Sequence, residues 1–324
     1  HPTACYHVNT GNRFGGDPAV GAWVTYGLGS LNDNLPGFVV LPRNSYPQGG
    51  ASNWSNGYLP ADHQGTPLRP EGSPILDLHA PAGMTRKDQR NNLDLLAKLN
   101  GKHFKARPDQ GELDARMSSY ELAYRMQTSA PEALDISKEP EHIRKMYGVD
   151  EKRCQHFARQ CLTARRLVER GVRFIELTCP GGNGDRWDQH NKLQDGHTKN
   201  CKSVDQPIAA LISDLRRLGL LDSTLIVWGG EFGRTPFAQG SNGRDHNPFG
   251  FTMWFAGGGI KKGVSVGSTD EFGYKAVENR YEIHDLHATM LHLLGIDHTK
   301  STFRFSGRDM RLTDVHGHLI KEIL

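Results

Sequence analysis

The chain has 324 residues, with 39 lysines and arginines against 36 aspartates and glutamates, and its formal net charge is +3. Its 36% hydrophobic and 23% charged residues are typical of a folded globular protein and exclude a disordered or fibrous chain. Because charges of both signs are interleaved and no apolar run reaches the roughly 20 residues that cross a bilayer, we expect neither a nucleic-acid-binding protein nor an integral membrane protein.

The first half of the chain divides into an irregular and a helical part. Residues 1–85 are rich in Gly, Pro, Asn and Ser, and we expect them to be mostly irregular apart from a short helix within residues 21–30. From residue 86 to residue 170 apolar side chains recur three and four residues apart, and the runs end at glycines such as Gly101 and Gly171. This part is predicted to be helical.

Strands alternate with helices in the second half. Apolar runs at residues 172–178, 224–229 and 250–257 predict strands, and residues 203–219 and 284–295 predict helices. Ser203 and Gln206 resemble a capping box, with Pro207 in the first turn. The alternation predicts a single three-layer α/β/α domain over residues 1–324, with a mostly parallel sheet and the helical part at residues 86–170.

Acidic and histidine side chains collect in the loops that follow the first two of these strands. The loop after residues 172–178 contains Asp185, Asp188, His190 and His197, and the loop after residues 224–229 contains Glu231, Arg234, Arg244, Asp245 and His246. In open α/β sheets, ligands bind beyond the carboxyl ends of the strands. Carboxylates with imidazoles suit Zn²⁺ or Mn²⁺, with Ca²⁺ or Mg²⁺ as alternatives. We predict a metal site made by Asp188, His190, Glu231, Asp245 and His246.

Other polar residues leave two interpretations open. Arg234 and Arg244 could hold phosphate or sulfate oxygens, or each could pair with a neighbouring carboxylate. His284 is a candidate extra ligand, whereas Asp285 is placed to cap a helix. The other helix histidines, His287 and His292, are expected to be structural. A histidine at position 1 could chelate copper, but the simpler expectation is an arbitrary chain start.

The cysteines do not form a zinc-binding pattern. There are five of them, without a CxxC pair, so a zinc finger is not expected. A disulfide between Cys179 and Cys201 stays open if the protein is exported.

Long motifs resemble a bacterial sulfatase-like family of unknown function within the alkaline phosphatase superfamily. They include GAWVTYGLGS, WDQH, IVWGGEFGRTP, GRDHNPFGFTMWFAGGGIK and HDLHATMLHLLGID, and the resemblance covers nearly the whole chain. It implies an alkaline-phosphatase-like fold and a metal-dependent hydrolase of phosphate or sulfate esters. It further implies an exported protein, in the periplasm or at the cell surface, acting on a small ester or a sulfated glycan.

The same resemblance assigns roles to single residues. Asp188, His190 and His246 match metal ligands, and Arg234 would stabilise the anion. Glu231 stands where Asp is usual and Phe232 where His is frequent, which leaves a second metal site one ligand short. The nucleophile and the first strand would precede His1, so this carboxy-terminal majority is expected to be inactive alone. The alternative is a non-catalytic binding or structural protein on a degenerate scaffold.

Overall fold

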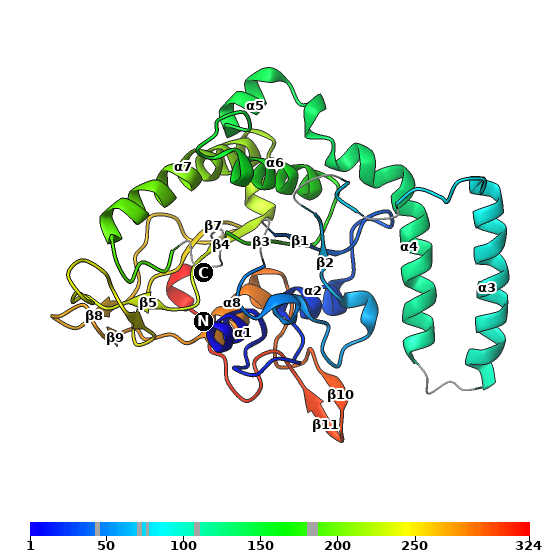
Figure 1. The fold of residues 1–324 in the computed structure, drawn as a ribbon. Coiled ribbons are helices and arrows are strands. Elements are labelled where there is room, and N and C mark those ends of the chain that lie inside the picture. The colour runs from blue at the N-terminus through cyan, green and yellow to red at the C-terminus, as the bar shows by residue number, and fades with distance from the viewer. Residues whose placement is uncertain (43–45, 70–72, 76–77, 107–110, 180–186) are drawn as a thin grey trace.

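The structure is a computed structural model that describes residues 1–42, 46–69, 73–75, 78–106, 111–179 and 187–324. Its α-helices in these ranges are α1 (Pro2–Thr10), α2 (Val20–Leu28), α3 (Arg86–Ala106), α4 (Gly111–Leu134), α5 (Glu141–Tyr147), α6 (Gln155–Glu169), α7 (Leu193–Arg217) and α8 (Ile283–Leu293). The strands are β1 (Phe38–Leu41), β2 (Thr66–Pro67), β3 (Phe174–Leu177), β4 (Leu225–Trp228), β5 (Gly233–Arg234), β6 (His246–Asn247), β7 (Trp254–Gly257), β8 (Ser268–Thr269), β9 (Ala276–Glu278), β10 (Phe303–Phe305) and β11 (Arg308–Met310). Helices α5, α6 and α7 lie on one side of the central strands, and α1, α2 and α8 lie on the other (Figure 1). The protein is therefore a mixed α/β protein.

A small parallel sheet has the strand order β2-β1-β3. Its central strand β1 pairs with β3, with Val39 opposite Ile175. Every residue of β1 is buried, so the strand shows a continuous apolar run instead of an alternating pattern. The short helix expected within residues 21–30 is confirmed as α2, whereas the rest of residues 1–85 was wrongly expected to be irregular, because it also supplies α1 and the centre of the sheet.

The remaining strands pair in twos and run antiparallel, so the predicted mostly parallel sheet was also wrong. Strand β4 pairs with β7, with Ile226 opposite Ala256. Residues 229–253, all of them described, contain the β5–β6 pair and no α-helix. Parallel neighbours need a long crossover, usually a helix, and without one the chain returns beside β4 in the opposite direction.

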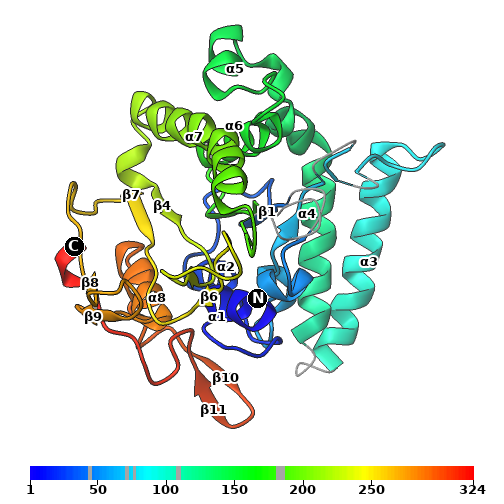
Figure 2. The ribbon, with the colours of Figure 1, turned by 60° about the vertical axis from the view of Figure 1, so that its left-hand side comes forward.

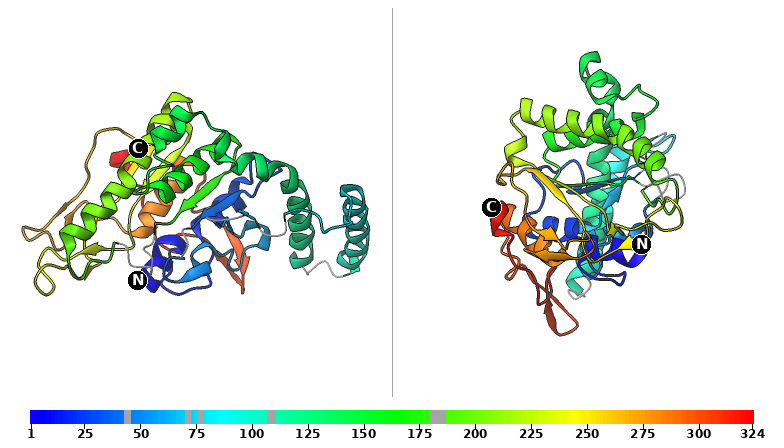
Figure 3. Two further views of the ribbon diagram at one scale, coloured as in Figure 1. Left: turned by 45° about the horizontal axis from the view of Figure 1, so that its top comes forward. Right: turned by 90° about the vertical axis from the view of Figure 1, so that its left-hand side faces the viewer.

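The helical part predicted at residues 86–170 is confirmed, since it contains α3, α4, α5 and α6. Helices α3 and α4 form a hairpin that projects from the side of the molecule (Figure 3). An ion pair between Arg90 and Glu121, 2.5 Å from Nη2 to Oε1, links the two helices. Helix α6 buries Phe157, Cys161 and Leu162 in a core shared with α5 and α7.

Helix α7 begins earlier than predicted. It includes Pro207 within the helix, so the predicted start near Ser203 was wrong. The Ser203 hydroxyl donates to the carbonyl of Asn200 at 2.6 Å, and the Gln206 amide donates to the carbonyl of Met146 at 3.2 Å. Both residues lie inside the helix and not at its start, where a capping box would be. The longer helix therefore starts directly after the loop that contains Asp188.

Helix α8 confirms the helix predicted at residues 284–295, and it anchors α1 (Figure 2). The backbone N–H of Glu282 donates to Asp285 at 2.8 Å, in a capping box. The buried His287 donates from Nε2 to the carbonyl of Val8 at 2.8 Å, and His284 donates from Nε2 to the carbonyl of Gly11 at 2.9 Å. These contacts fix the end of α1 opposite to His1.

None of the helices within the described ranges is long and apolar enough to cross a membrane. This agrees with the expectation that the chain has no integral membrane segment.

Candidate metal centre

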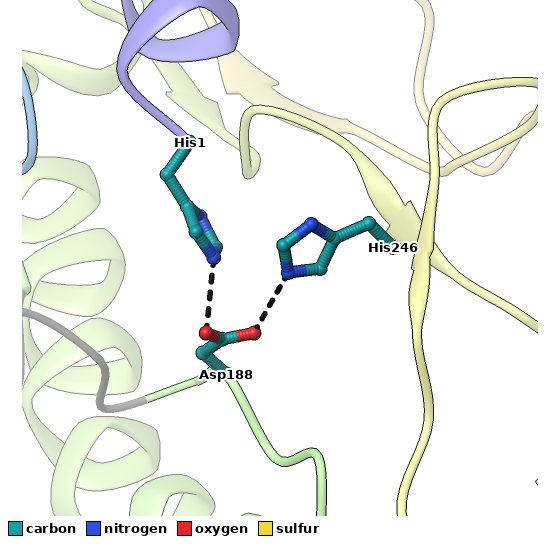
Figure 4. Close-up of side chains that lie close together, drawn as sticks. All are labelled: His1, Asp188 and His246. Atoms are coloured by element: carbon teal, nitrogen blue, oxygen red, sulfur yellow. Dashed lines mark hydrogen bonds and ion pairs between the residues drawn. The ribbon is translucent and has the colours of Figure 1, made fainter. Parts of the chain in front are cut away.

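Asp188 is the residue around which the polar side chains of the site gather (Figure 4). Its Oδ1 atom lies 2.9 Å from Nε2 of His190 and 3.1 Å from Nε2 of His246. Its Oδ2 atom lies 3.0 Å from Nε2 of His1. The Nε2 atoms of His190 and His246 are 3.1 Å apart. Three imidazole nitrogens therefore surround one largely buried carboxylate.

The β5–β6 pair delivers two of the side chains that touch Asp188. Arg234 and His246 lie directly opposite each other in this pair. Opposite residues of an antiparallel pair project on the same face, so both side chains reach the same carboxylate. Nη2 of Arg234 lies 2.5 Å from Oδ1 of Asp188.

His190 is held in place by a close contact between its loop and residues 239–244. The backbone N–H of Arg244 donates to the carbonyl of Gln189 at 3.0 Å, and the N–H of Leu193 donates to the carbonyl of Asn242 at 3.1 Å. A Cβ atom on Gly243 would lie 1.9 Å from the carbonyl oxygen of His190. Glycine is therefore required where the two loops meet.

His1 enters the site from the start of α1. Its Nδ1 atom lies 2.5 Å from Oε1 of Glu231, a residue 230 positions later in the chain. Its ring centroid is 4.4 Å from that of His246 and 4.9 Å from that of Phe232. The side chain is only 14% exposed, so His1 is part of the interior of the site.

Two of the imidazoles share one orientation. Nδ1 of His1 contacts the Glu231 carboxylate, and Nδ1 of His190 contacts the amide oxygen of Gln239. These oxygens accept a hydrogen bond from Nδ1–H, and in the neutral ring this leaves the lone pair on Nε2, the atom that faces Asp188. Metal-binding histidines usually have this arrangement, in which an oxygen behind the ring fixes the tautomer.

Arg234 sets the charge state of the carboxylate. Burial acts to raise the pKa of Asp188, but the hydrogen bond and charge of Arg234, with help from His246 and His190, hold the pKa below its usual value. Asp188 is therefore ionised at neutral pH. Nη1 of Arg234 is buried and has no hydrogen-bond partner in the described parts of the chain. One arm of the guanidinium thus binds Asp188 and the other is available to a further oxygen.

The structure brings most of the predicted site residues together. Asp188, His190 and His246 are in direct contact, and Glu231 joins them through His1. Asp245 is more exposed: its Oδ1 accepts the backbone N–H of His246 at 2.8 Å and lies 4.0 Å from Nδ1 of His190. The donor atoms of His190, Asp245 and His246 nevertheless lie within 4.8 Å of one another, as do those of His1, Asp188 and His246.

Several candidates lie elsewhere. Asp185 falls outside the described residues. His284 and His287 bind backbone carbonyls of α1 instead of the cluster. Cys179 and Cys201 do not form a disulfide.

Two residues of the site were not found by sequence reasoning. His1 is more than 180 positions from the other members of the cluster and belongs to no local motif, so its sequence position suggests only an arbitrary start or a copper chelator. Gln239 is an amide in a polar loop, and no spacing distinguishes it. The sequence signal that could have shown this is the helix at residues 2–10, which begins at a proline and is followed by Gly11. Recognising this helix would have placed His1 at the start of an ordered element.

The fold and the site define a mixed α/β protein whose strand-end loops and first helix gather three histidines and an aspartate. Over residues 1–324 the chain matches the family described as a protein of unknown function (DUF1501), and it belongs to this family. No curated protein and no solved structure matches the chain. These findings contradict the predicted membership of a sulfatase-like family in the alkaline phosphatase superfamily, because the family that covers the whole chain has no described function and nothing links it to that superfamily. The specific alkaline-phosphatase-like fold is likewise not supported.

Proposed function

We propose that this protein is a metal-dependent hydrolase of phosphate or sulfate esters, and that His1, Asp188, His190 and His246 hold its divalent cation. The observation that carries the proposal is the convergence of three Nε2 atoms on one ionised carboxylate, with an arginine beside it. This proposal rests on the geometry of the site alone.

The spacing of the donor atoms fits a metal ion. In a tetrahedral zinc site with metal–ligand bonds of about 2.0–2.1 Å, neighbouring donor atoms are roughly 3.3 Å apart. Here the contacts among Oδ1 of Asp188 and Nε2 of His190 and His246 are 2.9, 3.1 and 3.1 Å. Neutral imidazoles would direct their Nε2 lone pairs at the negatively charged carboxylate, and these groups would repel one another. A cation bound between them would remove this repulsion.

The donor types favour some cations over others. Imidazole nitrogens suit Zn²⁺ and Mn²⁺, whereas Ca²⁺ and Mg²⁺ take oxygen ligands. Three histidines and one aspartate therefore favour Zn²⁺ or Mn²⁺. Glu231 and Gln239 would orient His1 and His190 from behind, which assigns Glu231 to a supporting position.

Arg234 supports an anionic substrate. Its buried Nη1 lacks a hydrogen-bond partner among the described residues, and its side chain lines a shallow depression together with Lys202 and Arg244. A forked guanidinium binds the oxygens of phosphate or sulfate groups well. Arg234 would therefore bind a non-bridging oxygen of the ester and stabilise the charge that develops there in the transition state. A bound cation supplies polarisation of the ester and activation of water.

Metal binding is the first test of this proposal. We would titrate Zn²⁺ and Mn²⁺ into the metal-free protein by calorimetry and measure bound metal after dialysis. The decisive variant is Asp188→Asn, which keeps the shape of the side chain and removes its charge. Its matched control is Asp195→Asn in the exposed first turn of α7. We expect about one equivalent of metal in the wild type and the control, and at least a roughly 100-fold loss of affinity in Asp188→Asn.

Hydrolysis is then measured with p-nitrophenyl phosphate and p-nitrophenyl sulfate. Turnover of either ester that depends on metal and on Asp188 supports the hydrolase. Wild-type metal affinity in Asp188→Asn would overturn the metal site. Metal binding without turnover of either ester would reject the hydrolase and favour a non-catalytic metal-binding protein.

A further inference from the structure

We infer that the cleft beside the metal centre binds an extended anionic polysaccharide, so that the scissile ester belongs to a polyanionic chain. This inference rests on the proposed function for the ester chemistry, but the binding of the chain stands on separate observations.

The cleft is large and includes part of the metal centre. Its volume is about 1780 Å³, and His1, Glu231 and His246 contribute to its wall. Further parts of the wall come from β7, α8, residues 248–253, residues 260–266 and residues 275–282. A small-molecule site has a typical volume of about 300–1,000 Å³. The cleft therefore has room for a ligand that extends well beyond one ester group at the metal centre.

Positive charge is concentrated in this cleft although the whole chain is nearly balanced, with a net charge of +3. The lining carboxylates are Glu231 and Glu282, and both are already engaged, Glu231 with His1 and Glu282 in the capping box of α8. The lining cations are Arg13, Arg216, Lys261, Lys262, Lys275 and Arg280.

These cations are not neutralised by the protein. In the residues that the structure describes, none of the six lies within 4.0 Å of a carboxylate, whereas exposed arginines elsewhere, such as Arg304 and Arg308, are paired with aspartates. Lys261 donates to the backbone carbonyl of Glu322 at 3.2 Å, and Lys275 lies 6.0 Å from the ring centre of Phe249. Uncompensated charge along a concave wall attracts a ligand with several negative groups.

Exposed rings in the same cleft favour a sugar chain. Phe249, Phe251 and Tyr281 line it and are 55%, 37% and 37% exposed. Such rings give flat apolar surfaces against which sugar rings can pack. The chain's pI of about 8.5 is below the value of roughly 9 that marks a typical nucleic-acid-binding domain. The concave shape fits a chain better than a flat lipid surface.

The test measures binding of fluorescent dextran sulfate to the metal-free protein. The double variant Lys261→Glu/Lys262→Glu should bind it at least about tenfold more weakly, because repulsion replaces attraction at two adjacent positions. The matched control Lys98→Glu/Lys102→Glu changes the net charge equally, at exposed positions of α3. This helix lies far from β7 and α8, which line the cleft (Figure 1). It should bind as the wild type does. Circular dichroism verifies that all variants are folded.

Binding of other polymers and of vesicles tests which class of ligand the cleft prefers. Uncharged dextran should not bind, and a single-stranded oligonucleotide or anionic vesicles should bind more weakly than dextran sulfate. Equal losses in the two double variants, or tighter binding of the oligonucleotide or the vesicles, would overturn the inference.

Asp188→Asn separates this inference from the proposed hydrolase. It should lose metal but keep its affinity for dextran sulfate. Dextran sulfate binding in a protein that takes up no metal would reject the hydrolase and leave the cleft assignment standing. Metal uptake without dextran sulfate binding would reject the cleft assignment and leave the proposed hydrolase standing.

Discussion

Nε2 of His287 lies 2.8 Å from the carbonyl oxygen of Val8, and this contact joins α8 to the helix that carries His1. Burial lowers the pKa of the His287 imidazole from 6.5 to about 4, although the bond to Val8 acts to raise it. The folded protein therefore holds this ring neutral at pH values where the unfolded chain protonates it.

Stability should decrease as the pH is lowered through this window. Between pH 6.5 and pH 4 the unfolded state binds a proton that the native state does not, so the contribution of His287 is complete above pH 6.5 and is lost progressively below it. This predicts a decrease of about 2 kcal/mol between pH 7 and pH 5 from this residue. Urea unfolding of the metal-free protein at several pH values measures it. His287→Gln should flatten the pH dependence, and His292→Gln, on the exposed side of the same helix, should leave it unchanged.

Glu231→Gln tests whether Glu231 supports the metal site from behind His1. Loss of an outer partner typically weakens metal binding by about 10–100-fold, so we expect an effect of that size and smaller than that of Asp188→Asn. Calorimetry with Zn²⁺ measures it, with Glu271→Gln as an exposed control. An effect as large as that of Asp188→Asn would instead identify Glu231 as a direct ligand.

Gly243→Ala should damage the site through the backbone. The added Cβ would meet the carbonyl oxygen of His190 at 1.9 Å, so the two loops must separate and His190 must move. We expect weaker Zn²⁺ binding and a lower melting temperature. Gly101→Ala is the matched control, because its Cβ would meet no atom within 4 Å and alanine favours a helix. Unchanged metal affinity in Gly243→Ala would show that His190 contributes little to the site.

Arg234→Gln should separate catalysis from metal binding. Loss of a group that stabilises transition-state charge typically costs about 10²–10³ in kcat, so hydrolysis of the p-nitrophenyl ester should decrease by that factor. The pKa of Asp188 should rise because its main charge partner is removed. Metal titration at pH 7 should change much less than kcat. A wild-type kcat in Arg234→Gln would remove this residue from the proposed reaction.

Part of the site could be predicted because loops at the ends of strands carry a local signal. Strands β3 and β4 have apolar runs that are easily recognised, and Asp188 and Glu231 lie in the segments that follow these two strands in the chain. His246 belongs to a polar stretch of sequence with several other charged residues. Local sequence could therefore propose the carboxylates and two of the histidines.

The remainder depends on contacts between distant segments. Strand β1 is buried on both faces, so its pattern lacks the alternation of a half-buried strand. Pro207 lies inside α7 because tertiary packing outweighs the local preference for a helix start there. Strand β7 runs antiparallel to β4 because the chain between these two strands contains no helix. No single residue encodes the direction of this strand.

The contact between His1 and Glu231 spans 230 positions and has a consequence for the order of folding. During synthesis, a chain that has emerged only as far as β3 contains His1 but lacks Asp188, Arg234 and His246. Closing so long a loop has a large entropic cost, which only the packed domain can offset. A cation that needs all these side chains would bind only after the domain has folded. Because it would bind the native state alone, it would stabilise the folded protein against unfolding but would not stabilise a partly synthesised or partly folded chain.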